Sequence, residues 1–258
     1  QGGDSSTVAS SLTSGVSSIV SNGNAFAALK TDGSVVTWGG ADYGGNSSGV
    51  ASSLSSGVSS IVGNSLAFAA IKTDGSVVTW GYADRGGDSS SVASSLTSGV
   101  SSIVSSNIAF AAIKTDGSVV TWGYSNYGGD SSTVASSLTS GVSSIVSNNS
   151  AFAALKSNGS VVTWGYGSNS SDYSNYGGDS SSVASSLTSG VSSIVSNSSA
   201  FAALKTDGSV VTWGRDSYGG DSSSVDLTGV SSIVGASHAF AVLKTDGSVV
   251  TWGHSSYG

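Results

Sequence analysis

A segment of about 42 residues occurs six times in this chain, and this repetition constrains the fold more than any other feature. The run Ala-Phe-Ala-Ala-Leu-Lys-Thr-Asp-Gly-Ser-Val-Val-Thr-Trp-Gly covers Ala25–Gly39 and recurs in close variants that begin at Ala67, Ala109, Ala151, Ala200 and Ala239. Successive copies are 42, 42, 42, 49 and 39 residues apart. Fixed periods of about 20–50 residues are typical of solenoids and β-propellers, so each repeat is expected to be one small structural unit.

Each repeat contains three short segments that favour β-strands. In the first copy these are Ser17–Ser21, Ala25–Lys30 and Ser34–Gly39. Thr-Asp-Gly joins the second and third segments and predicts a hairpin with a type I′ turn, in which both central residues need a positive φ. The fourth copy has Ser-Asn-Gly at 157–159, and Asn-Gly satisfies the same requirement.

The rest of each repeat has a different pattern. In Gly3–Gly15, Asp4 precedes Val8 and Leu12, which are four residues apart, and a glycine ends the run. This order favours a short helical turn with an aspartate at its start and a glycine at its end. A fourth, edge strand is the alternative.

Apolar residues occupy both faces of the predicted strands. One face carries Phe26, Ala28, Val36 and Trp38, and the other carries Ala25, Ala27, Leu29 and Val35. Burial on both faces is expected of a sheet that is packed between two other sheets, as in a propeller blade. We therefore predict a mainly β fold: a closed six-bladed β-propeller that forms one domain over residues 1–258, with about three strands and a short helical turn per blade. Closure would place Gly3–Leu12 beside the blade that contains Trp252.

The repeat resembles the regulator-of-chromosome-condensation repeat family, whose pattern is Gly-x-x-His, a short apolar strand, Asp-Gly, and a strand ending in Trp-Gly. The best match is Gly235–Gly253, with Gly235, His238, Asp246-Gly247 and Trp252-Gly253 in place. The resemblance implies a propeller. The founding members of that family have seven blades, longer repeats and Gly-Gln-Leu-Gly where this chain has Gly-Gly-Asp-Ser-Ser. No nucleotide-exchange residue maps onto this sequence, so exchange activity and chromatin binding are not implied.

Composition excludes several classes of partner. The chain has 15 acidic and 8 basic residues, and its net charge of −7 repels nucleic acids and anionic membranes. No apolar run approaches 18 residues, so membrane insertion is not expected. Because the chain has no Met, Gln1 is expected to follow either a removed secretory signal or a fragment boundary. We expect an extracellular location, or one on the surface of a cell or particle.

The residues that recur in every repeat are better explained by structure than by chemistry. The six tryptophans could stack on sugars, but each one ends an apolar strand, and packing between blades is the better interpretation. The aspartates of Gly-Gly-Asp-Ser-Ser are expected to cap helices, because one carboxylate per loop is too few for calcium. The only histidines are His238 and His254, and no Gly-x-Ser-x-Gly motif is present. We predict a non-enzymatic protein with no catalytic residue, metal or cofactor.

The repeats differ from one another mainly in two loops. The first loop follows the first strand, at residues 22–24, 64–66, 106–108, 148–150, 197–199 and 236–238. The second loop follows the third strand, at residues 40–43, 82–85, 124–127, 166–176, 215–218 and 254–257. Strands one and three of an antiparallel meander run in the same direction, so both loops are expected on one face of the molecule, opposite the Asp-Gly turns.

This variable-loop face is the predicted binding site. Tyrosine and arginine are frequent anchors of interfaces, and the loops concentrate both. The predicted partner-binding residues are Tyr43, Tyr82, Arg85, Tyr124, Tyr127, Tyr166, Tyr173, Arg215, Tyr218, His238 and His254. The partner would be a protein, a glycan or another copy of the chain, and the chain an interaction or structural module. Two alternatives remain open: a lectin-like propeller with one glycan site per blade, and neutral drift of exposed loops.

Overall fold

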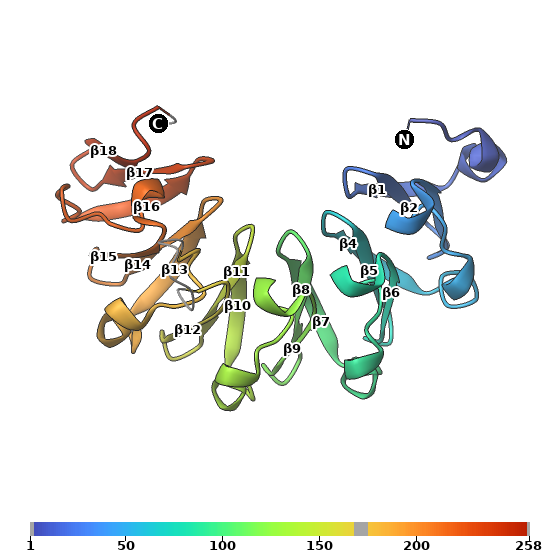
Figure 1. Ribbon diagram of the computed structural model, residues 1–258, viewed down its shortest axis with the longest axis horizontal. Coiled ribbons are helices and arrows are strands. Elements are labelled where there is room, and N and C mark those ends of the chain that lie inside the picture. Colours follow the sequence, from blue (N-terminus) through green and yellow to red (C-terminus); the bar gives the residue numbers. More distant parts are fainter. Residues whose placement is uncertain (1–2, 168–174, 257–258) are drawn as a thin grey trace. The chain divides into compact units, whose positions relative to one another are not determined.

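The computed structural model describes residues 3–167 and 175–256, and this part of the chain forms six three-stranded antiparallel sheets (Figure 1). In every sheet, strands that are consecutive in sequence are hydrogen-bonded neighbours. The chain divides into two compact units, unit 1 (Gln1–Ser125) and unit 2 (Asn126–Gly258), with three sheets in each. The sheets match the blades of the predicted mainly β, six-bladed propeller, and are numbered blades one to six in chain order.

The strand bounds confirm three strands per repeat. Unit 1 contains β1 (Val16–Ser21), β2 (Ala25–Lys30), β3 (Val35–Gly39), β4 (Val58–Gly63), β5 (Ala67–Lys72), β6 (Val77–Gly81), β7 (Val100–Ser105), β8 (Ala109–Lys114) and β9 (Val119–Gly123). Unit 2 contains β10 (Val142–Ser147), β11 (Ala151–Lys156), β12 (Val161–Gly165), β13 (Val191–Ser196), β14 (Ala200–Lys205), β15 (Val210–Gly214), β16 (Val230–Gly235), β17 (Ala239–Lys244) and β18 (Val249–Gly253).

The turn between the second and third strands differs from the predicted type I′ turn. In blade one the N–H of Gly33 donates to the carbonyl of Lys30 at 2.9 Å, and Gly33 has a φ of +78°. No other residue type has a positive φ in the described part of the chain, so Asp32 is not left-handed and the type I′ prediction was wrong. The hydrogen bond and the single left-handed glycine fit a type I turn followed by a glycine bulge, which also suits Asp-Gly.

The middle strands are buried on both faces, as the sequence predicts. In β5, every residue from Ala67 to Ile71 is buried. Small alanine side chains allow neighbouring blades to approach closely, and the larger Phe68 stacks on Trp80 within the blade, with ring centroids 5.3 Å apart. Every blade has such a Phe–Trp pair, with centroids 5.2–5.3 Å apart. The core therefore lies in the middle of each sheet and between successive sheets.

A glycine and a tryptophan join successive blades within each unit. The indole N–H of Trp80 donates to the carbonyl of Gly44 in the preceding loop at 3.1 Å. Gly44 has a φ of +97°, and a Cβ at this residue would lie 2.7 Å from the ring of Phe68, so only glycine fits. The same bond recurs at 3.0–3.1 Å in the pairs Trp122–Gly86, Trp164–Gly128, Trp213–Gly177 and Trp252–Gly219.

These five tryptophans are 2–6% exposed, which confirms their predicted burial between blades. Trp38 of blade one is only half-buried, although it stacks on Phe26 at 5.2 Å. The prediction that every tryptophan is largely buried was wrong for Trp38. Blade one is the first along the chain, so no preceding blade of unit 1 covers this indole.

The segment before most blades is helical, which confirms the favoured prediction and makes the edge-strand alternative wrong. The helices are of the 3₁₀ type: η1 (Ser6–Leu12), η3 (Ser48–Val50), η5 (Ser90–Leu96), η7 (Ser132–Ser137) and η8 (Ser181–Leu187). The Asp or Asn two residues before each helix accepts a hydrogen bond from the backbone N–H of the first helical residue at 2.8–3.0 Å. This bond lowers the pKa of Asp4, Asp88 and Asp130. The N-cap itself is a serine whose side chain makes no capping bond, so the aspartate lies one residue before the cap position that was predicted for it.

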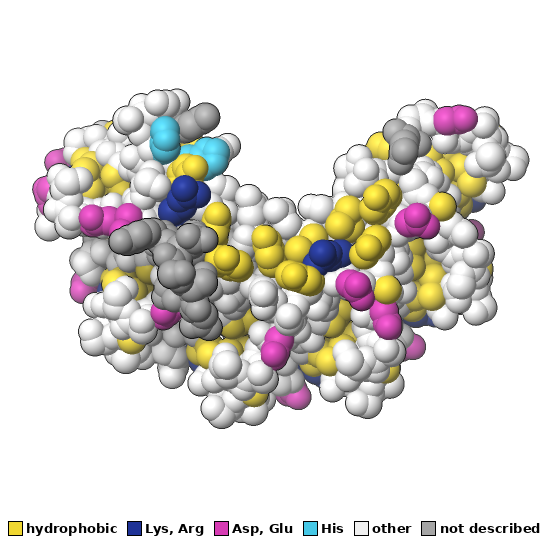
Figure 2. Space-filling model, in the orientation of Figure 1, with side chains coloured by type: hydrophobic (Ala, Val, Ile, Leu, Met, Phe, Trp, Pro, Cys, Tyr) yellow, Lys and Arg dark blue, Asp and Glu magenta, His cyan; other side chains and the backbone are white. Residues whose placement is uncertain are grey.

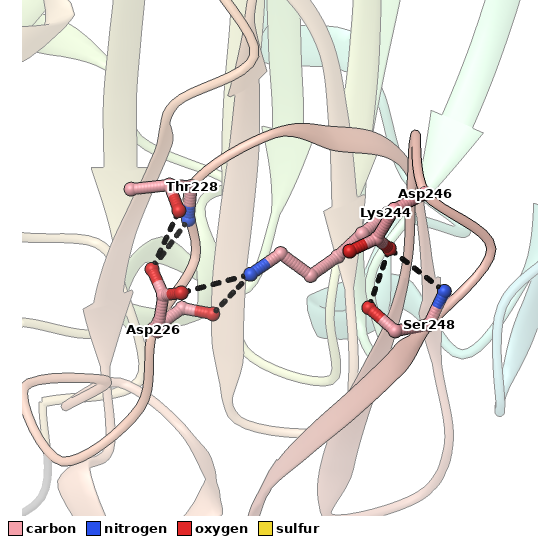
Figure 3. Close-up of polar contacts among 5 residues, drawn as sticks. All are labelled: Asp226, Thr228, Lys244, Asp246 and Ser248. Carbon is pink, nitrogen blue, oxygen red and sulfur yellow. Dashed lines mark hydrogen bonds and ion pairs between the residues drawn. The ribbon is translucent and has the colours of Figure 1, made fainter.

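Lysines at the ends of the second strands bind the chain at or just after the ends of these helices. The ammonium groups of Lys72, Lys114, Lys156 and Lys205 donate to serine carbonyls of the same repeat at 2.7–3.2 Å. Blade six is different because three residues are missing before it. There Lys244 pairs with Asp226 at 2.9 Å, the only ion pair among the described residues (Figure 3).

Asp226 also accepts hydrogen bonds from the N–H and hydroxyl of Thr228, at 3.0 and 2.7 Å (Figure 3). The hydrogen bond from Lys244, followed by those from Thr228, lowers the pKa of Asp226 to about 2. An ion pair thus replaces the helix-end contact that the shorter loop removes.

Closure of the six blades into one ring, and the single domain that it implies, stay predictions. The seven-residue insertion of the longest repeat coincides with residues 168–174, which lie outside the described residues. No helix within residues 3–167 and 175–256 is long and apolar enough to cross a membrane.

Candidate interaction face

The two variable loops of each blade lie side by side, at the end of the sheet opposite the Asp-Gly turn. In blade one the N–H of Gly40 donates to the carbonyl of Asn24 at 2.8 Å, which joins the loop after β3 to the loop after β1. The equivalent bond occurs in the other five blades at 2.9–3.0 Å. Within each blade this confirms that both loops share one face.

A buried asparagine fixes the two loops to each other in four blades. In blade two the side-chain amide of Asn64 donates to the carbonyl of Arg85 at 2.6 Å, and its oxygen accepts the N–H groups of Leu66 and Ala67, each at 2.8 Å. Asn22, Asn148 and Asn197 make the same three contacts, and all four are only 5–7% exposed. The residue at the first position of this loop therefore stabilises the fold in these four blades. The sequence analysis had placed the whole loop on the variable surface.

The loop after the third strand contains a short 3₁₀ turn that the sequence analysis missed. These turns are η2 (Ala41–Tyr43), η4 (Ala83–Arg85), η6 (Ser125–Tyr127) and η9 (Asp216–Tyr218). Each is followed by the glycine that contacts the next blade's Phe–Trp pair, as Gly86 does at Phe110 and Trp122. The backbone under the predicted partner-binding residues is therefore tied to the core.

In unit 1, the predicted site residues form contacts from blade to blade. The rings of Tyr43 and Tyr82 stack with centroids 6.4 Å apart and an angle of 15° between planes. The guanidinium carbon of Arg85 lies 3.9 Å from the ring centroid of Tyr124. The Nη1 atom of Arg85 is buried without a hydrogen bond, so its main contact is the ring. In Figure 2, hydrophobic side chains (yellow, a colour that includes tyrosine) flank a dark-blue cationic group in this unit.

Unit 2 continues the same pattern. Tyr166 contacts Tyr127 and Tyr176 edge to face, with centroids 5.9 and 5.3 Å apart. Tyr218 contacts Arg215 at 4.4 Å and lies 4.5 and 5.7 Å from His238 and His254, respectively. Figure 2 shows the two histidines (cyan) beside a dark-blue cationic group. Both histidines therefore belong to the aromatic surface.

We call these residues the aromatic row: Tyr43, Tyr82, Arg85 and Tyr124 in unit 1, and Tyr127, Tyr166, Tyr176, Arg215, Tyr218, His238 and His254 in unit 2. Tyr82 is 43% exposed, and the other members are half-buried. The structure thus brings ten of the predicted site residues into pairwise contacts and adds Tyr176. Tyr173 lies outside the described residues.

The opposite face is uniform in shape and chemistry. In blade three Asp116 accepts the hydroxyl of Ser118 at 2.6 Å and its N–H at 2.8 Å, and these bonds, with the hydroxyl's the larger effect, lower the pKa of Asp116. The same bonds lower the pKa of Asp32, Asp74, Asp207 and Asp246. Asn158 makes the same two contacts in blade four. These carboxylates accept hydrogen bonds within their own turns. Substitutions on this face can therefore act as controls in binding experiments on the variable-loop face.

A pocket of about 500 Å³ opens on the variable-loop face of unit 1, between the loops after β3 and β6. Its polar lining comes from Asp42, Asn46, Tyr82 and Asp84. Unit 2 has two grooves of about 490 and 360 Å³ at repeat-equivalent places in blades four and five, beside β12 and β15. Trp164 and Trp213 line these grooves but are only 2% exposed, so neither offers a free ring face.

Comparison with sequences found no family model and no curated protein that matches this chain. Several solved structures resemble it. The ectodomain of the Physcomitrella patens receptor kinase CR4 is 16% identical, with a TM-score of 0.47, and the match covers 92% of this chain and 61% of that ectodomain. The CRINKLY WD40 ectodomain of the Arabidopsis thaliana receptor kinase ACR4 is 20% identical, with a TM-score of 0.45 and coverage of 92% and 85%, respectively.

A third similar structure is Prp20p from Saccharomyces cerevisiae, also described as yeast RCC1, a protein characterised for its binding to Gsp1p and histones. It is 16% identical, with a TM-score of 0.49, and the match covers 92% of this chain and 71% of Prp20p. At these identities and TM-scores the likeness says nothing of the function or partners of this chain.

Proposed function

We propose that this chain is a non-enzymatic interaction module that binds a protein partner through its variable-loop face. The observation that carries the proposal is the aromatic row, in which half-exposed tyrosine, arginine and histidine side chains lie on a backbone fixed by buried asparagines and by glycines with no room for a Cβ. Tyrosine and arginine contribute large contact areas to interfaces. A loop that is already ordered also loses little conformational entropy when it binds.

The negative charge of the chain favours a partner with a positively charged surface. The net charge of −7 disfavours nucleic acid, and the exposed Asp42 and Asp84 beside the aromatic row favour a basic protein surface. An extracellular location and self-association are further parts of the proposal.

The test is selection of binding peptides from a phage-displayed random library, followed by affinity measurements on variants. Peptides that use the proposed face should lose affinity for Tyr82→Ala when they bind unit 1, or for Arg215→Ala when they bind unit 2, and should keep it for Asp116→Asn on the opposite face. Asn158 shows that asparagine satisfies the same turn, so Asp116→Asn is expected to keep the fold. Peptides whose binding responds only to changes at the Asp-Gly turns would refute the proposed face.

A glycan-binding function is the second candidate, and the repeat-equivalent grooves of blades four and five favour it. Thr163 and Asp179 line one of these grooves, and Thr212 and Asp221 line the other. The missing feature is an exposed ring for a sugar to stack on, which ranks this candidate lower. Binding on a glycan array that is lost in Asp179→Ala and Asp221→Ala, and retained in Tyr82→Ala, would favour it over the protein-binding proposal.

A further inference from the structure

The pocket between blades one and two has walls that suit a cation. Asp42 and Asp84 line it and are exposed, and neither carboxylate makes a hydrogen bond or ion pair within the described residues. Tyr82 supplies an aromatic wall that is 43% exposed. None of the lining residues is basic. An exposed ring and two carboxylates that line the same pocket attract positive charge through the quadrupole of the ring and through Coulomb attraction.

The chemistry points to an organic cation rather than a metal ion. The described residues contain no group of three or more His, Cys, Asp or Glu side chains that could hold a metal. Two carboxylates from separate loops are also fewer oxygen ligands than calcium normally takes. A volume of about 500 Å³ accommodates a whole side chain.

Elsewhere in this chain, tyrosine rings of the variable loops pack against arginine guanidinium groups. Tyr124 occupies the position in blade three that Tyr82 occupies in blade two, and its ring holds the guanidinium of Arg85 with the carbon 3.9 Å from the centroid. Arg215 lies over the ring of Tyr218 in its own loop, at 4.4 Å. At the junction of blades one and two, the position equivalent to Arg85 is Tyr43, which stacks on Tyr82 with centroids 6.4 Å apart, so a guanidinium from a partner would use the part of the Tyr82 ring that stays exposed.

We propose that the pocket formed by Asp42, Tyr82 and Asp84 binds an arginine side chain of the protein partner. The guanidinium would lie against the exposed part of the Tyr82 ring and donate hydrogen bonds to the two carboxylates, which match its planar set of donors. This assignment rests on the proposed function and names the residue type that the variable-loop face recognises.

The test measures binding of N-acetyl-arginine amide, with the uncharged N-acetyl-citrulline amide as the matched ligand. Because the chain has no cysteine, a trifluoromethyl label on Ser48→Cys, an exposed position beside the pocket, gives one ¹⁹F NMR signal that reports this pocket. The arginine compound should shift the signal saturably, and the citrulline compound should not. The same label on Ser90→Cys, the equivalent position of the next blade, should respond to neither, because Asn126 replaces one of the two carboxylates there and the positive charge of Arg85 already lies over Tyr124.

Variants then separate the contributions of the lining residues. Asp42→Asn and Asp84→Asn should each weaken binding by about 2- to 5-fold, the range expected for an exposed ion pair. Asparagine stands at the equivalent position 126 of blade three, so the loop should keep its fold. Tyr82→Ala should abolish saturation, and Asp116→Asn should leave binding unchanged.

Two results would overturn the proposal: equal binding of the citrulline compound, or wild-type affinity in all three pocket variants. The result of this binding test can be distinguished from the result of the peptide-library test of the proposed function. If library-selected peptides depend on Arg215 and the arginine compound does not shift the Ser48→Cys signal, the pocket assignment fails while the interaction face stands. If the arginine compound binds and the peptides depend only on the Asp-Gly turns, the pocket stands and the proposed face fails.

Discussion

Replacing Trp122 with alanine should destabilise the protein strongly, because this side chain links two blades. Trp122 is 2% exposed, its ring stacks on Phe110 with centroids 5.3 Å apart, and its indole N–H donates to the carbonyl of Gly86 at 3.1 Å. Large-to-small substitutions of buried aromatic residues cost about 3–5 kcal/mol, which combines lost transfer energy with the cavity that remains. We expect the free energy of unfolding to fall by this amount.

Part of the cost comes from the hydrogen bond. The carbonyl of Gly86 would lose its partner, and an unsatisfied buried acceptor costs about 1–3 kcal/mol. The loop also has little freedom to fill the cavity, because Gly86 is already in contact with the ring of Phe110. The loss of unfolding free energy expected for Trp122→Ala therefore lies in the upper half of the range of about 3–5 kcal/mol.

Trp38→Ala is the matched control. Trp38 makes the same stacking contact within its blade but is only half-buried, so its replacement should cost about half as much, roughly 1.5–2.5 kcal/mol. The assay is urea unfolding followed by far-ultraviolet circular dichroism, since both substitutions remove an indole and would distort a fluorescence signal. A loss below about 1 kcal/mol for Trp122→Ala would refute the assignment of this tryptophan to the blade junction.

Three further predictions concern the glycines, the blade-six ion pair and closure. Gly86→Ala should lower the thermal midpoint, because its Cβ would lie 2.6 Å from a phenylalanine ring at a φ of +97°, whereas Gly49→Ala, with open space around its Cβ, should be neutral; equal effects would contradict this. The lowered pKa of Asp226, about 2 against 3.8, means that its contribution to stability is complete above pH 3.8 and is lost as the pH falls through 2. Urea midpoints of wild type and Asp226→Asn should therefore converge as the pH falls from 5 to about 2, and a constant difference would argue against the pair. Closure predicts a short distance between spin labels on Ser10→Cys and Ser255→Cys, measured by double electron–electron resonance, and a broad, long distribution would refute it.

Much of the fold could be predicted because the strands have apolar residues on both faces and the pattern occurs six times. The turn between Lys30 and Ser34 could not be assigned correctly, because Asp-Gly suits both a type I′ turn and a type I turn with a glycine bulge. The structure has the second form, in which Asp32 also accepts hydrogen bonds from the N–H and hydroxyl of Ser34. The half-buried state of Trp38 depends on its place in the first blade, which its sequence context, identical to that of the other copies, does not reveal.

The sequence predicted which residues belong to the candidate site, but not which of them contact one another. Tyr82 and Arg85 were identified because they occupy a loop that varies among repeats. Their contacts with Tyr43 and Tyr124 depend on how far one blade is offset from the next, which spacing in sequence does not specify. The structural role of Asn64 left a signal, since asparagine recurs at this position in four of the six repeats while the next two residues vary.

The division between fixed and variable positions explains how this face could acquire specificity without loss of stability. Gly86 and Asn64 hold the loop backbone of blade two through a contact with the next blade and through three hydrogen bonds. The side chain at position 85 is then required only to pack on the next aromatic ring. Arginine does this at position 85 and tyrosine at position 43, each against a tyrosine of the following blade. Since a stacked arginine and a stacked tyrosine both satisfy the fold, the charge at this position is free to vary, and charge is the property that a partner protein would distinguish.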